Sequence, residues 1–163
     1  MTNKVWPLPG IRADVLKSPH PGSFGARRKY DRHTGIDLYC PEGSRVVAVE
    51  SGTVVTVENF TGPNADDPSP WWLDTQAVLV EGESGVICYG EIETTLKRGQ
   101  VVLAGDPIGF VKRVLKEDKG TSTSMLHFEL YRMGTRKTVW WYEGPMQGQG
   151  YDLLDPTELL DAL

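Results

Sequence analysis

Two short stretches of the sequence contain residues that could bind a metal ion. His33 and Asp37 lie in "RHTGID" (residues 32–37), and His127 lies in "SMLHFELYR" (residues 124–132). Imidazole nitrogens and carboxylate oxygens are zinc ligands, and catalytic zinc sites commonly use three protein groups and leave one coordination position open. The three residues therefore raise the hypothesis of a zinc centre.

Spacing alone does not establish this centre. On a straight strand His33 and Asp37 would be about 13 Å apart, whereas ligands of one zinc ion lie about 2 Å from it. The chain must fold back between them, and Gly35 permits such a bend because it has no Cβ. In the second stretch, His127 and Glu129 share one face of a predicted strand. A surface histidine beside an aspartate is the alternative that spacing leaves open.

The elements around these residues are predicted to be strands. Short alternating or apolar runs are separated by turns rich in Gly and Pro, and the pattern favours a single all-β domain over residues 1–163, a sandwich or partly open barrel. One short helix is predicted at the C-terminus, with Asp155 as N-cap, Pro156 at the first helical position and Glu158 at the third. The predicted strands are 45–50, 53–58, 77–80, 85–89, 100–103, 108–114, 126–131 and 138–142.

Composition excludes several classes of protein. The chain has 163 residues, 39% of them hydrophobic and 24% charged, and no apolar run approaches the roughly 20 residues of a membrane span. A net charge of −5 gives no basic surface for nucleic acid. No secretory signal is visible, so we expect synthesis in the cytoplasm. Cys40 and Cys88 are expected to be two unrelated buried thiols, with a single disulfide as the alternative.

A loop at residues 59–76 interrupts the regular strand spacing and resembles an insertion. It contains three prolines, three aspartates and the pair Trp71–Trp72. Loops of this length in a compact domain are commonly functional. An exposed aromatic pair would suit a peptide, a glycan or a protein partner, and packing back over the sheet is the alternative.

The order of several motifs resembles the lysostaphin-like, LytM-type zinc endopeptidases. This resemblance implies a duplicated-hybrid-motif β fold, a zinc ion in a groove with His33, Asp37 and His127 as ligands, and cleavage of peptide cross-links in bacterial peptidoglycan. It covers roughly residues 18–160 and leaves 1–17 as an N-terminal extension. The motifs are "SFGARR" (23–28), "RHTGIDLYCPEGSRVVAVESGTVV" (32–55), "YGEI" (89–92), "LKRGQVVLAGDPIGFV" (96–111), "MLHFEL" (125–130) and "DPTELL" (155–160).

Two positions depart from the family pattern. Active relatives have catalytic histidines where this chain has Glu91 and Met125. Such histidines move protons and stabilise developing charge, and a methionine thioether has no proton to give. Glu91 leaves three alternatives open: a general base, a fourth metal ligand, or a solvated residue at a strand end.

Two functions follow from these departures. We favour a zinc-binding, degenerate endopeptidase, weak or inactive, that holds a peptidoglycan peptide or a protein partner in its groove. The alternative is an active, atypical zinc endopeptidase with Glu91 as general base. Either protein could be delivered to the cell wall or belong to a phage particle.

Overall fold

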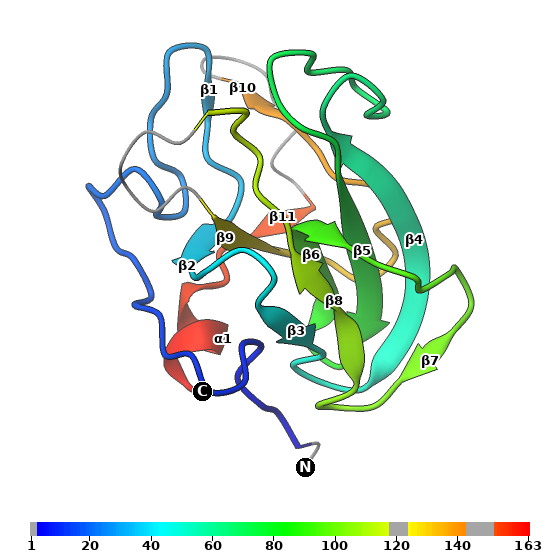
Figure 1. Cartoon of the computed structure of the whole chain (residues 1–163). Coiled ribbons are helices and arrows are strands. Elements are labelled where there is room, and N and C mark those ends of the chain that lie inside the picture. The colour runs from blue at the N-terminus through cyan, green and yellow to red at the C-terminus, as the bar shows by residue number, and fades with distance from the viewer. Residues whose placement is uncertain (1–2, 118–123, 143–151) are drawn as a thin grey trace.

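The computed structural model describes residues 3–117, 124–142 and 152–163 as an antiparallel β structure with one short helix (Figure 1). This confirms the all-β prediction. The elements are β1 (Asp31–Arg32), β2 (Ile36–Tyr39), β3 (Arg45–Val47), β4 (Gly52–Thr61), β5 (Thr75–Gly82), β6 (Gly85–Glu93), β7 (Val101–Val102), β8 (Pro107–Val111), β9 (Met125–Tyr131), β10 (Trp141–Tyr142), β11 (Leu153–Leu154) and α1 (Thr157–Asp161).

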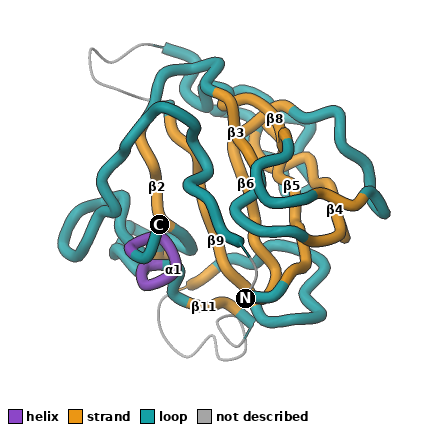
Figure 2. Tube along the Cα trace, turned by 90° about the horizontal axis from the view of Figure 1, so that it is seen from below, coloured by secondary structure: helices purple, strands orange, loops and turns teal. Residues whose placement is uncertain are grey.

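The main sheet has nine strands and does not close into a barrel. Its path runs β11-β9-β6-β5-β4-β7, while β2 pairs with β9, and β8 pairs with both β3 and β6. β1 and β10 form a separate two-stranded sheet. The helix α1 lies at one edge, near β2 and β11 (Figures 1 and 2). No helix in the described residues is long and apolar enough to cross a membrane.

The central strands β5, β6 and β9 are buried on both faces. Alternate side chains point to opposite faces of a strand, so each strand contributes to two clusters. Val78 and Ile87 join the larger cluster, whereas Leu79 and Cys88 join the smaller one. Burial of each such aliphatic side chain stabilises the fold by about 1.5–3 kcal/mol. The strand that carries His127 is therefore held firmly from both sides.

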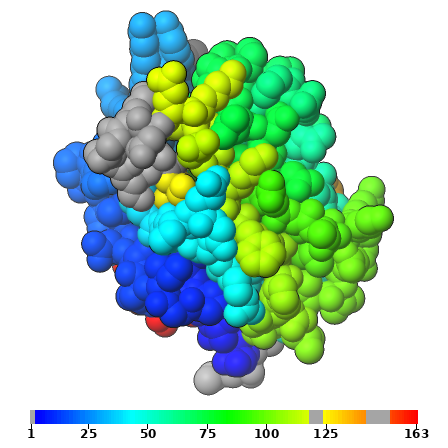
Figure 3. Space-filling model, in the orientation of Figure 1, coloured from blue at the N-terminus to red at the C-terminus, as the bar shows by residue number. Residues whose placement is uncertain are grey.

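The N-terminal segment, expected as an extension, packs on the body of the domain. Leu8 is fully buried in the larger cluster. The Val5 amide donates to the Val49 carbonyl (2.8 Å), and the Val47 amide donates to the Pro7 carbonyl (2.9 Å). Figure 3 shows this segment in dark blue against the segment that leads into β3. Residues 5–8 therefore contribute to the same core as the strands.

Several boundaries differ from the predicted ones. The strand at 36–39 was not predicted, and only Trp141–Tyr142 of the predicted strand 138–142 is a strand. β4 continues to Thr61 and β5 begins at Thr75, so the irregular loop covers 62–74 rather than 59–76. These ends pair with each other, as the Thr61–Thr75 register shows, although their sequence is polar.

The C-terminal helix begins close to the predicted place. α1 starts at Thr157, and the Asp155 carboxylate accepts the Thr157 backbone N–H at 2.9 Å. The N-cap is Pro156, without a side-chain capping bond, so the predicted N-cap at Asp155 was one residue too early; Asp155 instead accepts the N–H of the first helical residue from the position before the cap. Cys40 and Cys88 are both buried free thiols, as the preferred prediction stated.

Candidate metal centre

Three segments bring His33, Asp37 and His127 together. His33 lies between β1 and β2, Asp37 in β2 and His127 in β9, where Asp37 and His127 are direct cross-strand partners. The chain bends at Gly35, where a Cβ would come within 2.3 Å of the Phe128 carbonyl oxygen. Glycine at this position therefore lets the His33 segment approach β9 closely enough for the three side chains to meet.

The three facing atoms form a nearly equilateral triangle. His33 Nε2 lies 3.2 Å from Asp37 Oδ1 and 3.3 Å from His127 Nδ1, and Asp37 Oδ1 lies 3.0 Å from His127 Nδ1. Ligands about 2.0–2.1 Å from one zinc ion at tetrahedral angles are about 3.3 Å apart. The spacing of the triangle therefore fits three ligands of a tetrahedral zinc ion.

The outer ring nitrogens determine which atoms face the triangle. His33 Nδ1 lies 2.9 Å from the Ser23 carbonyl oxygen, and His127 Nε2 lies 2.9 Å from Glu129 Oε2. Both partners are acceptors, so we assign the ring N–H to these nitrogens and a lone pair to each inner nitrogen. Two lone pairs and a carboxylate oxygen would repel one another at these distances. The donor set thus requires a cation or a proton between its members.

The electrostatics of the metal-free centre agree with this requirement. Burial disfavours a charged His127, but its hydrogen bonds to Asp37 and Glu129 outweigh burial and raise the His127 pKa well above its ordinary value. Burial also opposes ionisation of Asp37, yet the hydrogen bonds from His127 and His33 hold the Asp37 pKa well below its usual range. The centre therefore keeps a positive charge beside a carboxylate even without a metal ion.

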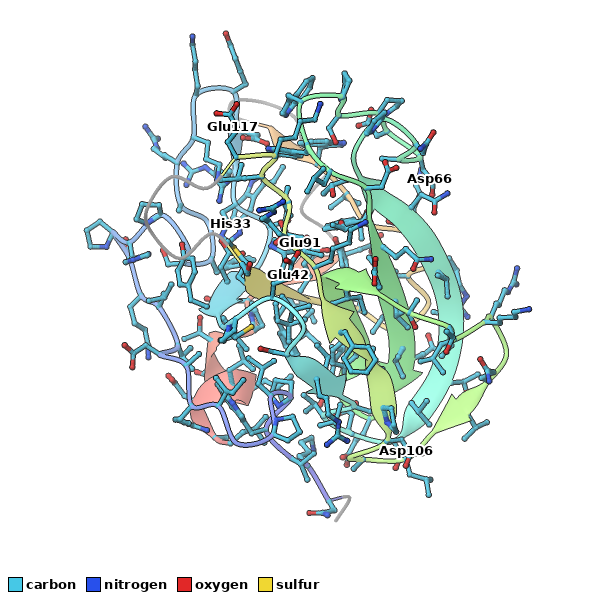
Figure 4. The ribbon with its side chains drawn as sticks, in the orientation of Figure 1. His33, Glu42, Asp66, Glu91, Asp106 and Glu117 are labelled. Atoms are coloured by element: carbon cyan, nitrogen blue, oxygen red, sulfur yellow. The ribbon has the colours of Figure 1, made fainter. Side chains whose placement is uncertain are left out.

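A groove of about 710 Å³ contains these residues and both catalytic positions. His33, Glu91 and Asp66 all line this groove, and Figure 4 labels His33 and Glu91 near the middle of the view and Asp66 toward the upper right. Trp72 and Trp140 both line the groove. The Trp140 indole donates to Asp67 of the 62–74 loop, so the segment that carries Trp140 is tied to the loop that carries Trp72.

Glu91 occupies the groove in an unusual conformation. It has a φ of 62°, and its Oε2 atom is buried with no hydrogen-bond partner in the described part of the chain. Burial, with a smaller effect of the nearby Asp37 charge, raises the Glu91 pKa to about 8, although His127 opposes the shift. Glu91 as a whole is half-buried, but its buried carboxylate oxygen argues against a fully solvated strand-end residue.

Glu91 also lies outside the ligand triangle. The group whose ligand atoms all lie within 4.8 Å of one another contains His33, Asp37 and His127 and does not include Glu91. A fourth tetrahedral ligand would lie about 3.3 Å from each of the others. Among the described residues, Glu91 is therefore not a fourth member of this ligand group.

Met125 is half-buried at the start of β9 and lines the same groove. It pairs with Tyr39 across β2 and β9, two residues before His127. Its thioether is a weak acceptor without a proton. This position contributes apolar surface to the groove and no group for proton transfer.

The two tryptophans of the loop differ in their surroundings. Trp71 is 62% exposed, whereas Trp72 is half-buried and forms an isolated bridge with Leu115. Their rings are 5.8 Å apart in an edge arrangement. One member of the pair therefore lines the groove and the other projects into solvent. A role in recognition stays a prediction.

Several groove residues were not identified from the sequence. The sequence pattern places Trp140 in the predicted strand 138–142 and Glu58 in the predicted strand 53–58, without a role for either in the groove. Glu58 is buried, and its carboxylate accepts the Thr138 N–H (2.8 Å) and the Thr138 hydroxyl (2.7 Å). It thereby holds the segment that carries Trp140. The alternation of Glu129 with His127 was the one available sign that this glutamate belongs to the centre.

The fold resembles that of several solved structures. A protein described as a peptidase M23 from Pseudomonas aeruginosa is 17% identical, with a TM-score of 0.51 over 100% of this chain and 56% of that one. A zinc-containing peptidase from Vibrio cholerae is 19% identical, with a TM-score of 0.54 over 79% of this chain and 36% of that one. Lysostaphin is 16% identical, with a TM-score of 0.50 over 99% of this chain and 51% of that one.

At such low identities, the structural likeness shows a shared fold alone. The chain spans only about a third to a little over half of the length of those structures. No curated protein matches the sequence. The family model described as peptidase family M23, however, matches residues 31–139, a segment that includes His33, Asp37, Glu91, Met125 and His127. The chain therefore belongs to peptidase family M23.

Proposed function

We propose that this protein is a zinc-binding, catalytically degenerate M23 peptidase that holds a peptide in its groove. His33, Asp37 and His127 would hold the ion through the three atoms of the triangle. The observation that carries this proposal is the spacing of 3.0–3.3 Å between three acceptor atoms. Zinc bound there would supply Lewis-acid polarisation of a carbonyl and a nucleophile at neutral pH.

Weak or absent hydrolysis follows from the residues beside the triangle. Hydrolysis of a peptide bond needs groups that move protons and stabilise the developing negative charge, and each commonly contributes about two to four powers of ten in rate. Met125 supplies neither of these. Glu91 is the remaining titratable group at these two positions, and it lines the groove together with Met125. Binding without efficient turnover is the function that this set of residues supports best.

The second candidate function is an active zinc endopeptidase that uses Glu91 as its base. The observation in its favour is the buried Oε2 of Glu91, which has no hydrogen-bond partner among the residues that the structure describes. Buried polar atoms without partners are uncommon, and at functional sites such an atom is free to contact a substrate. A carboxylate is a competent general base beside a catalytic metal.

The proposed ligand is a peptide of bacterial peptidoglycan, or a protein segment of similar extended shape. The groove volume, about 710 Å³, suits several residues of peptide, and Trp72, Phe60 and Trp140 provide apolar surface along it. Aromatic and apolar contacts of this kind are typical of recognition surfaces. We place the site of action at the cell wall, reached by export or within a phage particle.

Zinc analysis and two wall assays test this proposal. Purified protein should contain about one zinc ion by elemental analysis, should sediment with insoluble peptidoglycan and should leave the turbidity of a peptidoglycan suspension unchanged. Loss of sedimentation on addition of a chelator would link binding to the ion. Zinc-dependent clearing that is abolished in Glu91→Gln would replace the proposal by the second candidate, and absence of both zinc and sedimentation would refute both.

A further inference from the structure

Behind the ligand triangle, a chain of buried polar groups runs along one face of β9. His127, Glu129 and Tyr131 alternate on this strand, so their side chains point to the same side. Glu129 is 1% exposed and Tyr131 is fully buried. Neither lies at a position that the M23 resemblance assigns to catalysis or metal binding. Their contacts therefore need a separate explanation.

The Glu129 carboxylate accepts three hydrogen bonds. Its Oε2 atom accepts from His127 Nε2 at 2.9 Å and from the Thr34 hydroxyl, and its Oε1 atom accepts from the Tyr131 hydroxyl at 2.7 Å. A buried charge is tolerated only when it is paired and hydrogen-bonded in this way. Because three donors converge on Glu129, it is present as an anion that accepts and does not donate.

These bonds reach both segments that carry the histidines. His127 is held directly, and Thr34 is the chain neighbour of His33. The far end of the chain of bonds reaches the groove wall, because the Tyr131 oxygen accepts the Val139 backbone N–H at 3.2 Å. Val139 precedes Trp140, which lies on the rim. Glu129 and Tyr131 thus connect the triangle with the side of the groove.

We propose that Glu129 and Tyr131 are positioning residues that fix the orientation and tautomer of His127 and tie the metal centre to the groove wall. Glu129 holds the proton of His127 on Nε2, which leaves the Nδ1 lone pair facing His33 and Asp37. Tyr131 fixes the carboxylate in turn and anchors Val139. This inference rests on the proposed zinc site, and it extends that site by two residues.

Replacement of Glu129 by glutamine gives a sharp test. An amide has one acceptor oxygen and two donor hydrogens, so it cannot accept from His127, Thr34 and Tyr131 in the places where a carboxylate does. Loss of such outer partners typically lowers metal affinity about 10–100-fold. We expect Glu129→Gln to weaken zinc binding by this factor and Tyr131→Phe to weaken it severalfold, as measured by competition with a chromophoric chelator.

Two buried residues elsewhere provide matched controls. The Tyr89 hydroxyl accepts the Val49 N–H at 2.9 Å in the larger core, and the Glu50 carboxylate accepts two bonds from Ser84. Tyr89→Phe and Glu50→Gln remove the same chemical groups from equally buried places, so they should leave zinc affinity within about twofold. Equal losses in the controls and in the test variants would show a general effect of stability and would overturn the proposal.

The hydrogen-bonded proton on His127 Nε2 supplies a readout that does not depend on metal. In nitrogen-15 NMR spectra of folded, metal-free protein, His127 Nε2 should carry a hydrogen-bonded proton, and this resonance should be lost or exchange rapidly in Glu129→Gln. An unchanged resonance together with unchanged zinc affinity would overturn the positioning role. Wild-type protein that binds no zinc but shows the protected proton would refute the zinc site and leave the positioning role supported.

Discussion

The metal-centre residues and the residues at the two catalytic positions share one groove but differ in their hydrogen bonding. All four ring nitrogens of His33 and His127 have polar neighbours within 3.3 Å. At the other two positions, Glu91 has a buried oxygen with no partner within residues 3–117, 124–142 and 152–163, and Met125 offers no proton. The three proposed metal ligands are therefore held by hydrogen bonds, whereas the side chains at positions 91 and 125 are not held in this way by any described residue.

The largest effect is expected from removing one of the three proposed metal ligands. His127→Ala should reduce zinc content below detection and lower the free energy of unfolding by about 3–5 kcal/mol, because Asp37 would remain as an uncompensated buried charge. Elemental analysis and thermal melting measure both quantities. His20→Ala changes the exposed third histidine and should alter neither; retention of zinc in His127→Ala would remove the ligand assignment.

The next largest effect is expected from placing histidines at positions 91 and 125. Glu91→His combined with Met125→His should raise peptidoglycan hydrolysis by about two powers of ten or more, because each group typically contributes that much. Either single change should give less, since such residues act as a unit. Release of soluble wall fragments over time is the measurement. A double variant with zinc bound, an intact fold and no gain in rate would mean that the groove no longer admits a substrate productively.

The pH dependence of native stability tests the protonation of the buried Glu91 carboxyl. Burial raises the Glu91 pKa from 4.5 to about 8 in the metal-free protein, so the native state keeps a proton that the unfolded chain releases in between. Native stability should then fall as pH rises from 4.5 to 8, by at most about 1.4 kcal/mol per pH unit for one proton. Denaturant unfolding at several pH values should show a flatter profile in Glu91→Gln. Identical profiles for the two proteins would contradict this assignment.

The smallest effect is expected from replacing Trp71 and Trp72, the tryptophan pair of the 62–74 loop. Trp71→Ala with Trp72→Ala should weaken binding to wall fragments about tenfold or less, the range of an interface anchor, and should leave stability nearly unchanged. Sedimentation with peptidoglycan measures the first quantity and thermal melting the second. Phe110→Ala is the matched control, since this aromatic ring is 53% exposed and lies outside the groove. A loss of about 3–5 kcal/mol in the double variant would instead show that the pair belongs to the core.

The sequence predicts the parts of the centre that depend on residue type, and the structure adds those that depend on strand pairing. The strand class, the bend at Gly35 and the zinc-compatible chemistry of the ligands were all available from residue identities. The register that places Asp37 opposite His127 was not, because the four-residue strand β2 follows a bend and has too few residues for a periodic signal.

The hydrogen bonding of Glu91 and Glu129 could not be predicted from the sequence either. A single glutamate in a strand gives no sign in the sequence of whether its carboxylate will be saturated by donors or left without one. Glu129 receives its bonds from Thr34, which lies 95 residues earlier, and from neighbours on its own strand. Such long-range contacts decide the chemistry of both residues, and local patterns do not encode them.

The positive φ of Glu91 bears on how readily this site could change in evolution. Glu91 is the non-glycine residue with φ > 0 among those that the structure describes. A side chain in that region commonly costs about 1–3 kcal/mol, and histidine tolerates it better than most residues. The backbone at this position thus has a shape that also suits histidine, the residue that the family resemblance implies there. Under the proposed function, introducing a histidine at this position would require no rebuilding of the main chain.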